Sequence, residues 1–314
     1  MKKINVDTRI KLRGLYKLVV TDDTGKVTKQ IGPFENLITN AGLDLFWNGG
    51  PSLSSLGKYL IDGAFVGSGN TAPAVTDTTM TALVASVGNY NSPIGISGPL
   101  VYNAGPPPYS SVTFTAVFPA GTATGTLAEV GIGNNTTSPY TLFSHALIID
   151  GSGNPTTITV LSNEQLTLTY TLELYWNTTI QSGNISISGT TYALQWLPYN
   201  INGFTGNPRY CLDSNTWAPL AGYSGVIGTP TTLPSGTYAA AANSPTAPTY
   251  ISGNYYNTLT YTAALGELNF TGGIGTLIVS GAWHSFQIGF TPNIPKNNTY
   301  TLTFVCNVAW ARYP

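Results

Sequence analysis

Two histidines and two cysteines are the residues of this chain best suited to acid–base, nucleophilic or metal chemistry. His145 and His284 both lie inside short apolar runs, and no close cluster of His, Cys and carboxylate residues surrounds either of them. A metal site commonly needs three or four such ligands. We therefore expect both histidines to be structural residues of β-strands, with no metal site and no cofactor.

The cysteines and the acidic residues do not indicate a reactive site either. Cys211 and Cys306 could form a disulfide only if the fold brought their Cα atoms within about 6 Å, and we interpret them as two separate buried thiols. Glycoside hydrolysis needs two neighbouring carboxylates, whereas the thirteen acidic residues are scattered singly. We expect Glu129 to face solvent at a strand edge, with a buried acid as the alternative. We assign no catalytic residue and expect the chain not to be an enzyme.

Aromatic side chains are the remaining functional resource, with 19 Tyr and 6 Trp in 314 residues. Tyrosine and tryptophan offer large contact areas with a polar group, which suits sugar stacking and protein interfaces. Several lie in the Gly- and Pro-rich stretch 198–248, which is either a contact surface or a set of packed loops. Our candidates for glycan or partner contact are Trp196, Tyr210, Trp217 and Tyr223.

The composition places these residues in an all-β protein. Only 8% of residues are charged against 42% hydrophobic, with 35 Gly and 21 Pro. Helical bundles and α/β enzymes carry more charge on their outer faces, and a disordered chain carries less apolar content. A net charge of −1 argues against a nucleic-acid partner. No apolar stretch reaches 18 residues and none follows Lys2 and Lys3, so we expect neither membrane insertion nor a signal peptide.

The apolar pattern predicts a series of short strands with turns between them. A hairpin is expected at 15–31, followed by a short helix that Thr39 or Asn40 caps and that carries Leu43 and Phe46. A second short helix is expected at 77–84, capped by Thr76 or Asp77. Strands at such spacing are typical of antiparallel β-sandwiches.

The second half of the sequence repeats the pattern of the first. The final strand, 300–310, matches 166–176 position by position, and 259–265 resembles 112–118. We therefore predict two antiparallel β-sandwich domains related by an internal duplication, although any two amphipathic strands look alike. The expected divisions are a basic hairpin at 1–32 within the first domain, the rest of that domain at 33–180, and a second domain at 181–314 that carries the 198–248 loops.

The positive charge is concentrated at the N-terminus. Eight of the twelve basic residues precede position 30. Such a segment could bind an acidic surface of a neighbouring protein, or it could simply keep an exposed end soluble. The residues that we predict to dock are Lys2, Lys3, Arg9, Lys11, Arg13, Lys17, Lys26 and Lys29.

Five segments of the first 180 residues resemble the N-terminal region of tailed-bacteriophage virion appendage proteins, a group that includes tail-fibre, collar, baseplate and minor structural proteins. The segments are 34–44, 66–78, 128–133, 142–146 and 166–176. Their residues are of packing and turn types, and none of them is a catalytic residue of that family.

The resemblance implies a structural role in a particle with many subunits. We expect a virion protein, assembled in the host cytoplasm, that contacts other tail, portal or capsid proteins and forms a homo-oligomer such as a trimer. The alternatives are a receptor-binding module that recognises host glycans and a capsid decoration protein.

Overall fold

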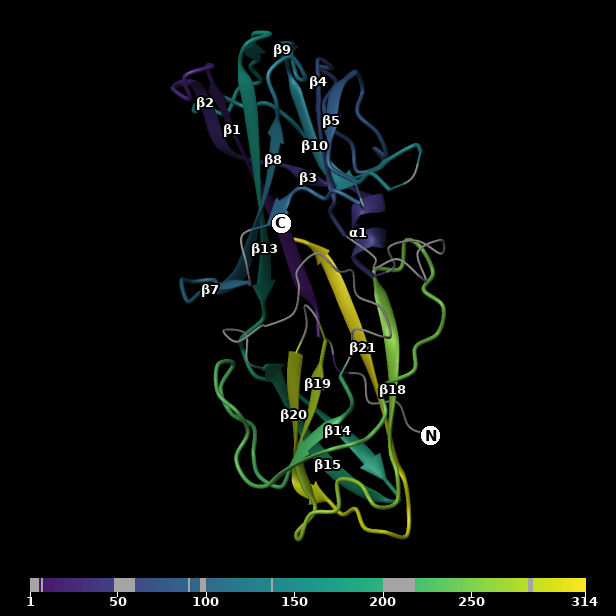
Figure 1. Cartoon of the computed structure of the whole chain (residues 1–314). Helices are drawn as coiled ribbons and strands as arrows, with labels where there is room; N and C mark the ends of the chain where they lie inside the picture. The colour runs from purple at the N-terminus through teal and green to yellow at the C-terminus, as the bar shows by residue number, and fades with distance from the viewer. Residues whose placement is uncertain are drawn as a thin grey trace.

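The computed structural model confirms the all-β prediction. It describes residues 6, 8–47, 60–89, 91–96, 100–136, 138–199, 218–281 and 285–314. Figure 1 shows an elongated molecule whose strands run largely along its length, with the first half of the chain at one end and most of the second half at the other. Sheets form because apolar and hydroxyl residues alternate along the strands.

The largest sheet contains eight strands from both halves of the chain. They follow the order β18-β21-β1-β13-β8-β6, with β2 also on β1 and β7 also on β8. Their bounds are β1 (Ile10–Thr21), β2 (Val27–Glu35), β6 (Gly95–Ile96), β7 (Val101–Asn103), β8 (Tyr109–Phe118), β13 (Gln165–Trp176), β18 (Tyr256–Ala263) and β21 (Leu302–Arg312).

A five-stranded sheet packs on the first half of this large sheet, in the order β3-β11-β10-β4-β5. The Tyr16 hydroxyl of β1 meets the Ser144 hydroxyl of β11 at 2.6 Å between the two sheets. A helix, α1 (Asn40–Trp47), lies against β11. The strands are β3 (Leu37–Ile38), β4 (Gly63–Gly67), β5 (Leu83–Val87), β10 (Glu129–Asn134) and β11 (Thr141–Leu147); β9 (Gly125–Leu127) and β12 (Ile158–Val160) form a separate pair.

A six-stranded sheet belongs to the second half of the chain and has the order β14-β15-β20-β19-β16-β17. Leu277 and Ile294 of this sheet line one apolar cleft together with Leu302 and Phe304 of β21. The strands are β14 (Gln181–Ile187), β15 (Thr190–Pro198), β16 (Ala221–Tyr223), β17 (Tyr238–Ala240), β19 (Ile274–Ser280) and β20 (Ser285–Ile294).

The two halves of the chain share one order of strands, and we call the two corresponding units repeats. In the first repeat (37–176), the sheet order β3-β11-β10-β4-β5 accompanies the pair β8-β13. In the second repeat (190–312), β15-β20-β19-β16-β17 accompanies the pair β18-β21. Corresponding strands follow one another in the same order along the chain, so the two repeats share one topology.

The pairing register repeats as well. Tyr170 of β13 lies opposite Phe114 of β8, and at the matching positions Phe304 of β21 lies opposite Tyr261 of β18. The backbone amide of Trp176 donates to the carbonyl of Pro108 in the first repeat. The amide of Trp310 donates in the same way to the carbonyl of Tyr255. The sequence match of the two final strands therefore reflects an equivalent position in the fold.

The expected division at residue 180 does not coincide with the sheets. Strands β18 and β21 of the second half continue the sheet of the first half, because Ile10–Leu12 of β1 pairs with Trp310–Arg312. This pair is parallel, whereas the other strand pairs in the described ranges are antiparallel. Figure 1 shows β21 reaching β1 near the centre of the molecule.

The N-terminal hairpin is likewise no separate module. Strand β1 pairs with β13 along its whole length, and its alternate residues, such as Ile10, Tyr16 and Leu18, are fully buried. The hairpin prediction itself is confirmed, with a turn at Asp22 to Lys26 in which Gly25 has a positive φ of 81°. Removing residues 1–30 would therefore remove a central strand.

The first predicted helix is confirmed and the second is wrong. The Thr39 hydroxyl accepts a 2.8 Å hydrogen bond from the amide of Gly42 and so caps α1, which buries Leu43 and Phe46 as expected. In place of a helix at 77–84, turns lead into β5, which pairs with β4. Asp77 turns inward to a histidine instead of capping a helix, as described next.

Candidate functional site

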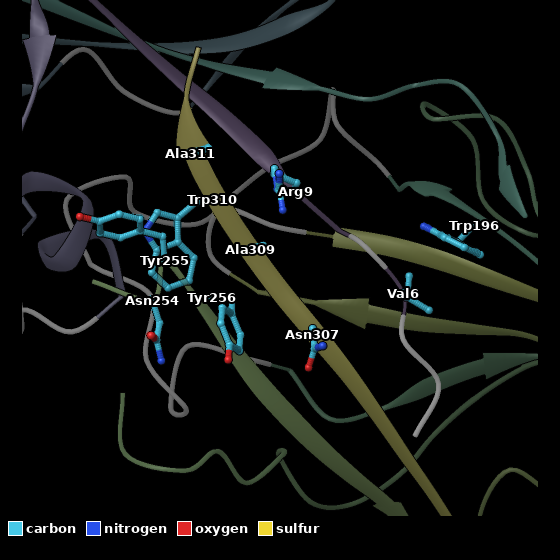
Figure 2. A pocket seen from close by; sticks show the side chains of 10 residues that line it. All are labelled: Val6, Arg9, Trp196, Asn254, Tyr255, Tyr256, Asn307, Ala309, Trp310 and Ala311. Carbon is cyan, nitrogen blue, oxygen red and sulfur yellow. The ribbon is translucent and has the colours of Figure 1, made fainter. Parts of the chain in front are cut away.

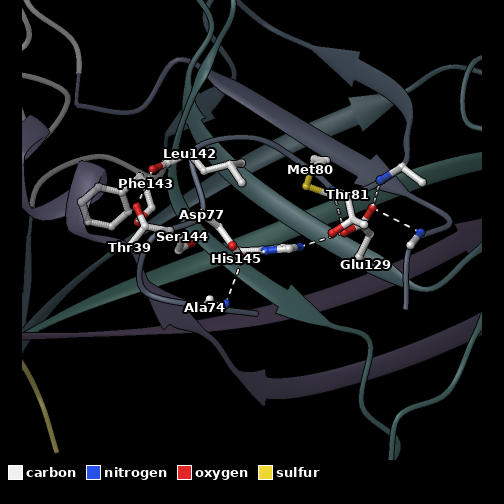
Figure 3. A network of polar contacts seen from close by, with 12 residues as sticks. Thr39, Ala74, Asp77, Met80, Thr81, Glu129, Leu142, Phe143, Ser144 and His145 are labelled. Atoms are coloured by element: carbon white, nitrogen blue, oxygen red, sulfur yellow. Dashed lines mark hydrogen bonds and ion pairs between the residues drawn. The ribbon is translucent and has the colours of Figure 1, made fainter. Parts of the chain in front are cut away.

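Asp77, Glu129 and His145 form a buried ionic network in the first repeat (Figure 3). His145 Nδ1 lies 2.7 Å from an Asp77 carboxylate oxygen, and His145 Nε2 lies 2.8 Å from a Glu129 carboxylate oxygen. His145 is 1% exposed and Glu129 is 0% exposed. The two residues lie on neighbouring strands, β11 and β10, whereas Asp77 comes from the loop between β4 and β5.

The prediction that Glu129 faces solvent is therefore wrong. The segment from 67 to 82 folds over this strand end and directs backbone amides at the carboxylate. Glu129 accepts hydrogen bonds from the amides of Gly69, Thr81 and Ala82 at 3.2, 3.2 and 2.7 Å. The carboxylate compensates for its burial with these amides and with His145.

The contacts within the network shift the pKa values of His145 and Glu129 toward the charged forms. Burial lowers the pKa of His145, but its hydrogen bonds and charge interactions with Glu129 and Asp77 outweigh burial and raise the pKa above its ordinary value. Burial raises the pKa of Glu129, and the hydrogen bonds from His145, Ala82 and Thr81 outweigh it and lower the pKa. Imidazolium between two carboxylates is the state that this geometry favours.

This arrangement suits a structural role, in which His145 holds the β4–β5 loop against β10 and β11, better than acid–base catalysis. We call it the structural tie. A histidine that acts as a general base needs a ring nitrogen within reach of the substrate. Both nitrogens of His145 contact carboxylates instead, and the ring is buried. The placement of His145 as a structural residue of β11 agrees with the sequence interpretation; His284 lies outside the described residues.

The segments that carry the phage resemblance meet around this tie. Thr39 donates its hydroxyl proton to the carbonyl of Leu142 at 2.7 Å, and the amide of Asn40 donates to the carbonyl of Val75 at 2.7 Å. His145 then connects 142–146 to Asp77 and Glu129. Four of the five segments are thus held together by hydrogen bonds, which accounts for their packing and turn residues.

The predicted docking residues fall into two groups. Arg13 forms ion pairs with Glu35 and with Glu173, the latter at 3.8 Å, and Lys29 pairs with Glu164 at 2.9 Å. These cations hold the hairpin against its neighbours. The residues without an ion pair inside the described ranges are Lys11, Lys17 and Lys26, while Arg9 lines a cleft and Lys2 and Lys3 lie outside the described residues.

The predicted aromatic contact residues do not form one surface. Trp196 lies in β15 and Tyr223 ends β16, and two strands separate them, a distance of about 14 Å at ordinary strand spacing. Tyr223 is 8% exposed and packs with Tyr199 and Ile278. Tyr210 and Trp217 lie outside the described residues, and the described part of 198–248 contributes β16 and β17 to a sheet.

An open cleft of about 490 Å³ lies along β21 and is lined by residues just before β1, by Trp196 and by residues of the β18–β21 pair (Figure 2). Its lining includes Arg9 and Trp196, two residues singled out from the sequence, together with Asn254, Tyr256 and Ala309. Tyr256 is 47% exposed. Sequence reasoning missed Asn254 and Tyr256 because nothing in their local pattern distinguishes them from other loop and strand residues.

Asp77 was also missed as a partner of His145, since 68 positions separate the two residues and only the fold joins them. Within the described ranges, no group of three or more His, Cys, Asp or Glu residues is arranged to hold a metal ion. Cys306 is a buried free cysteine, and burial raises its pKa; Cys211 lies outside the described residues. Within the described part of the chain, no helix is long and apolar enough to cross a bilayer.

Comparison with protein families, with curated proteins and with solved structures found no match to this chain.

Proposed function

We propose that this chain is a non-enzymatic structural protein of a tailed-bacteriophage virion, a component of the tail fibre, collar or baseplate that assembles as a homo-oligomer. The sequence resemblance supports assignment to a virion. The residues of the resembling segments hold those segments together by hydrogen bonds, which supports a structural role. Docking is assigned to the solvent face of β1, in place of a projecting N-terminal arm.

The observation that carries the docking proposal is the character of this face. Lys11 and Lys17 alternate with the buried residues of β1 and point away from the core. Lys17 lies opposite Thr169, which in turn lies opposite Thr115, so hydroxyl side chains surround the cation. Neither lysine has a carboxylate partner within the described part of the chain.

Such a face suits an acidic surface on a neighbouring virion protein. Lys11 and Lys17 lie on either side of Arg13, whose charge is compensated by Glu35 and Glu173. The two uncompensated cations attract carboxylates over about a Debye length of 8–10 Å and set the orientation of approach. The threonine side chains next to Lys17 are short and uncharged, so a partner can come close to this cation. A second copy of the same face would be repelled, so we assign the contact to a different virion protein.

Charge reversal tests this proposal without disturbing the core. Particles assembled with Lys11→Glu or with Lys17→Glu are expected to contain at least tenfold less of the protein than wild-type particles, as measured by mass spectrometry of purified virions. Lys26→Glu makes the same charge change at the exposed hairpin turn and is the matched control. Normal incorporation of both face variants would overturn docking through β1.

The structural role is tested separately by the mass of the purified protein in solution. Light scattering is expected to give a multiple of 33.1 kDa. A monomer at assembly concentrations would contradict the homo-oligomer.

A further inference from the structure

The two repeats differ at one position that opens the cleft on β21. In the first repeat, Tyr175 of β13 lies opposite Tyr109 of β8, and the two rings contact each other with centroids 5.2 Å apart. At the matching positions of the second repeat, Ala309 of β21 lies opposite Tyr256 of β18. The second repeat therefore keeps one tyrosine of the pair and has a methyl group in place of the other.

The loss of this ring leaves the face of Tyr256 uncovered. Tyr109, the counterpart of Tyr256 in the first repeat, is half-buried, whereas Tyr256 is 47% exposed. Figure 2 shows Tyr256 and Arg9 on opposite sides of the β21 ribbon, with Ala309 between them. Ala309 thus lines the cleft at the position where the first repeat carries the ring of Tyr175.

The lining of the cleft combines an apolar platform with polar groups at its rim. The Tyr256 ring and the Ala309 methyl group supply the apolar part. The side chains of Asn254 and Arg9 supply an amide and a guanidinium group at the rim. Asn307 also lines the cleft, and its Oδ1 accepts a hydrogen bond from the Thr258 hydroxyl at 2.8 Å. The volume of about 490 Å³ lies inside the range of about 300–1,000 Å³ that is typical of small-molecule sites.

From this lining we infer that the cleft binds a pyranose ring of a saccharide. One face of a pyranose carries C–H groups, which gain dispersion contacts on an aromatic ring. Its edge carries hydroxyl groups that both donate and accept hydrogen bonds, as amides and guanidinium require. A nucleobase also stacks on aromatic rings, and Trp196 lines the cleft as well as Tyr256; a nucleoside is therefore the alternative ligand class in the test below.

The inference goes beyond the proposed virion role and does not depend on it. The docking face lies around Lys11 and Lys17, whereas the cleft lies around Ala309, so each can be changed without the other. The binding assay uses the purified full chain and no particle. A negative result there would leave the docking proposal untouched, and normal incorporation of the lysine variants would leave the cleft untouched.

The test is saturation-transfer NMR with methyl glycosides of glucose, galactose, N-acetylglucosamine and glucuronic acid, and with adenosine as a planar competitor class. We expect at least one glycoside to bind the wild-type protein. Ala309→Tyr restores the ring of the first repeat and should weaken that binding at least tenfold, as should Tyr256→Ala. Tyr238→Ala removes a tyrosine that is 58% exposed outside the cleft and should leave binding unchanged.

Three results would overturn the inference. They are the absence of binding by all four glycosides, binding of adenosine alone, and unchanged glycoside binding in both Ala309→Tyr and Tyr256→Ala. A fourth contrary result would be loss of binding in Tyr238→Ala alone, which would place the saccharide near Tyr238 and outside the cleft. Circular dichroism of each variant establishes that the protein used is folded.

Discussion

The hydroxyl group of Tyr261 gives the sharpest test of how the two repeats are built. Tyr261 is fully buried, and its hydroxyl oxygen has no hydrogen-bond partner among the described residues. Phe114 occupies the equivalent position of the first repeat, opposite Tyr170 as Tyr261 is opposite Phe304. The fold therefore already holds a phenylalanine at this place, and we predict that Tyr261→Phe stabilises the protein.

The magnitude follows from the groups involved. A buried hydroxyl without a partner costs about 1–3 kcal/mol. Phenylalanine keeps the aromatic ring, so the loss is restricted to the contacts of one oxygen atom at about 0.1–0.2 kcal/mol for each atom pair. The free energy of unfolding should therefore rise by about 1 kcal/mol, which is the lower part of that range after the lost contacts are subtracted.

Urea denaturation followed by circular dichroism measures this difference, with two matched variants beside it. Phe114→Tyr places a hydroxyl in the corresponding apolar position and should destabilise by about 1–3 kcal/mol. Tyr16→Phe removes a buried hydroxyl that does have a partner, Ser144 at 2.6 Å, and should destabilise by about 0.5–1.5 kcal/mol. If Tyr261→Phe destabilised as much as Tyr16→Phe, the Tyr261 hydroxyl would have a partner such as a buried water molecule, and the reasoning would be refuted.

Two further predictions concern the first repeat. Because the pKa of His145 is raised in the folded state, its contribution to stability is present below the ordinary pKa of 6.5 and is lost as the pH rises through the folded pKa. Because the pKa of Glu129 is lowered, its contribution to stability is lost as the pH falls below 4.5. The unfolding free energy should therefore decline as the pH rises above 6.5, and His145→Gln should flatten that decline; an unchanged slope in the variant would exclude His145 as its source. Gly14→Ala should destabilise by about 1–3 kcal/mol in thermal or urea melts, because an added Cβ would overlap the Tyr170 hydroxyl and the Asn36 side chain; wild-type stability would show that these groups can move aside.

Local pattern was enough to predict the strands and the short helix. Alternation of apolar and hydroxyl residues in 166–176 matches the buried and half-buried faces of β13 along most of its length. Thr39 caps α1 as its side chain and position suggest. The match between 166–176 and 300–310 also carried over into the paired register, because both segments pack on the same kind of neighbouring strand.

Long-range contacts were beyond local pattern. The burial of Glu129 depends on amides from 69, 81 and 82, and on His145, none of which is adjacent to it in sequence. The false helix at 77–84 has the same origin. Asp77 is a good helix cap by type, but its carboxylate gains more from a buried imidazolium than from exposed amides. Tertiary contacts decided both cases.

The N-terminal concentration of positive charge has a structural cause that composition alone did not reveal. Strand β1 borders both repeats, since it pairs with β13 along its length and with β21 over its first three residues. Every second residue of β1 points away from the core, next to the second repeat at the start of the strand and next to the first repeat along the rest. A central strand with one solvent face accepts charged residues only at these outward positions.

The same strand places a cation beside the equivalent tyrosine position of each repeat. Lys11 pairs with Tyr175 in the first repeat, and Arg9, which precedes the Ile10–Trp310 pair, lines the cleft with Ala309 in the second. A cation and a tyrosine flank the middle strand in both repeats, and this strand carries a ring in the first repeat and a methyl group in the second. In the first repeat the protein fills the space itself with Tyr175. In the second the space is left open, so a single side chain separates a packed surface from a binding site, and Ala309→Tyr would convert the second into a copy of the first.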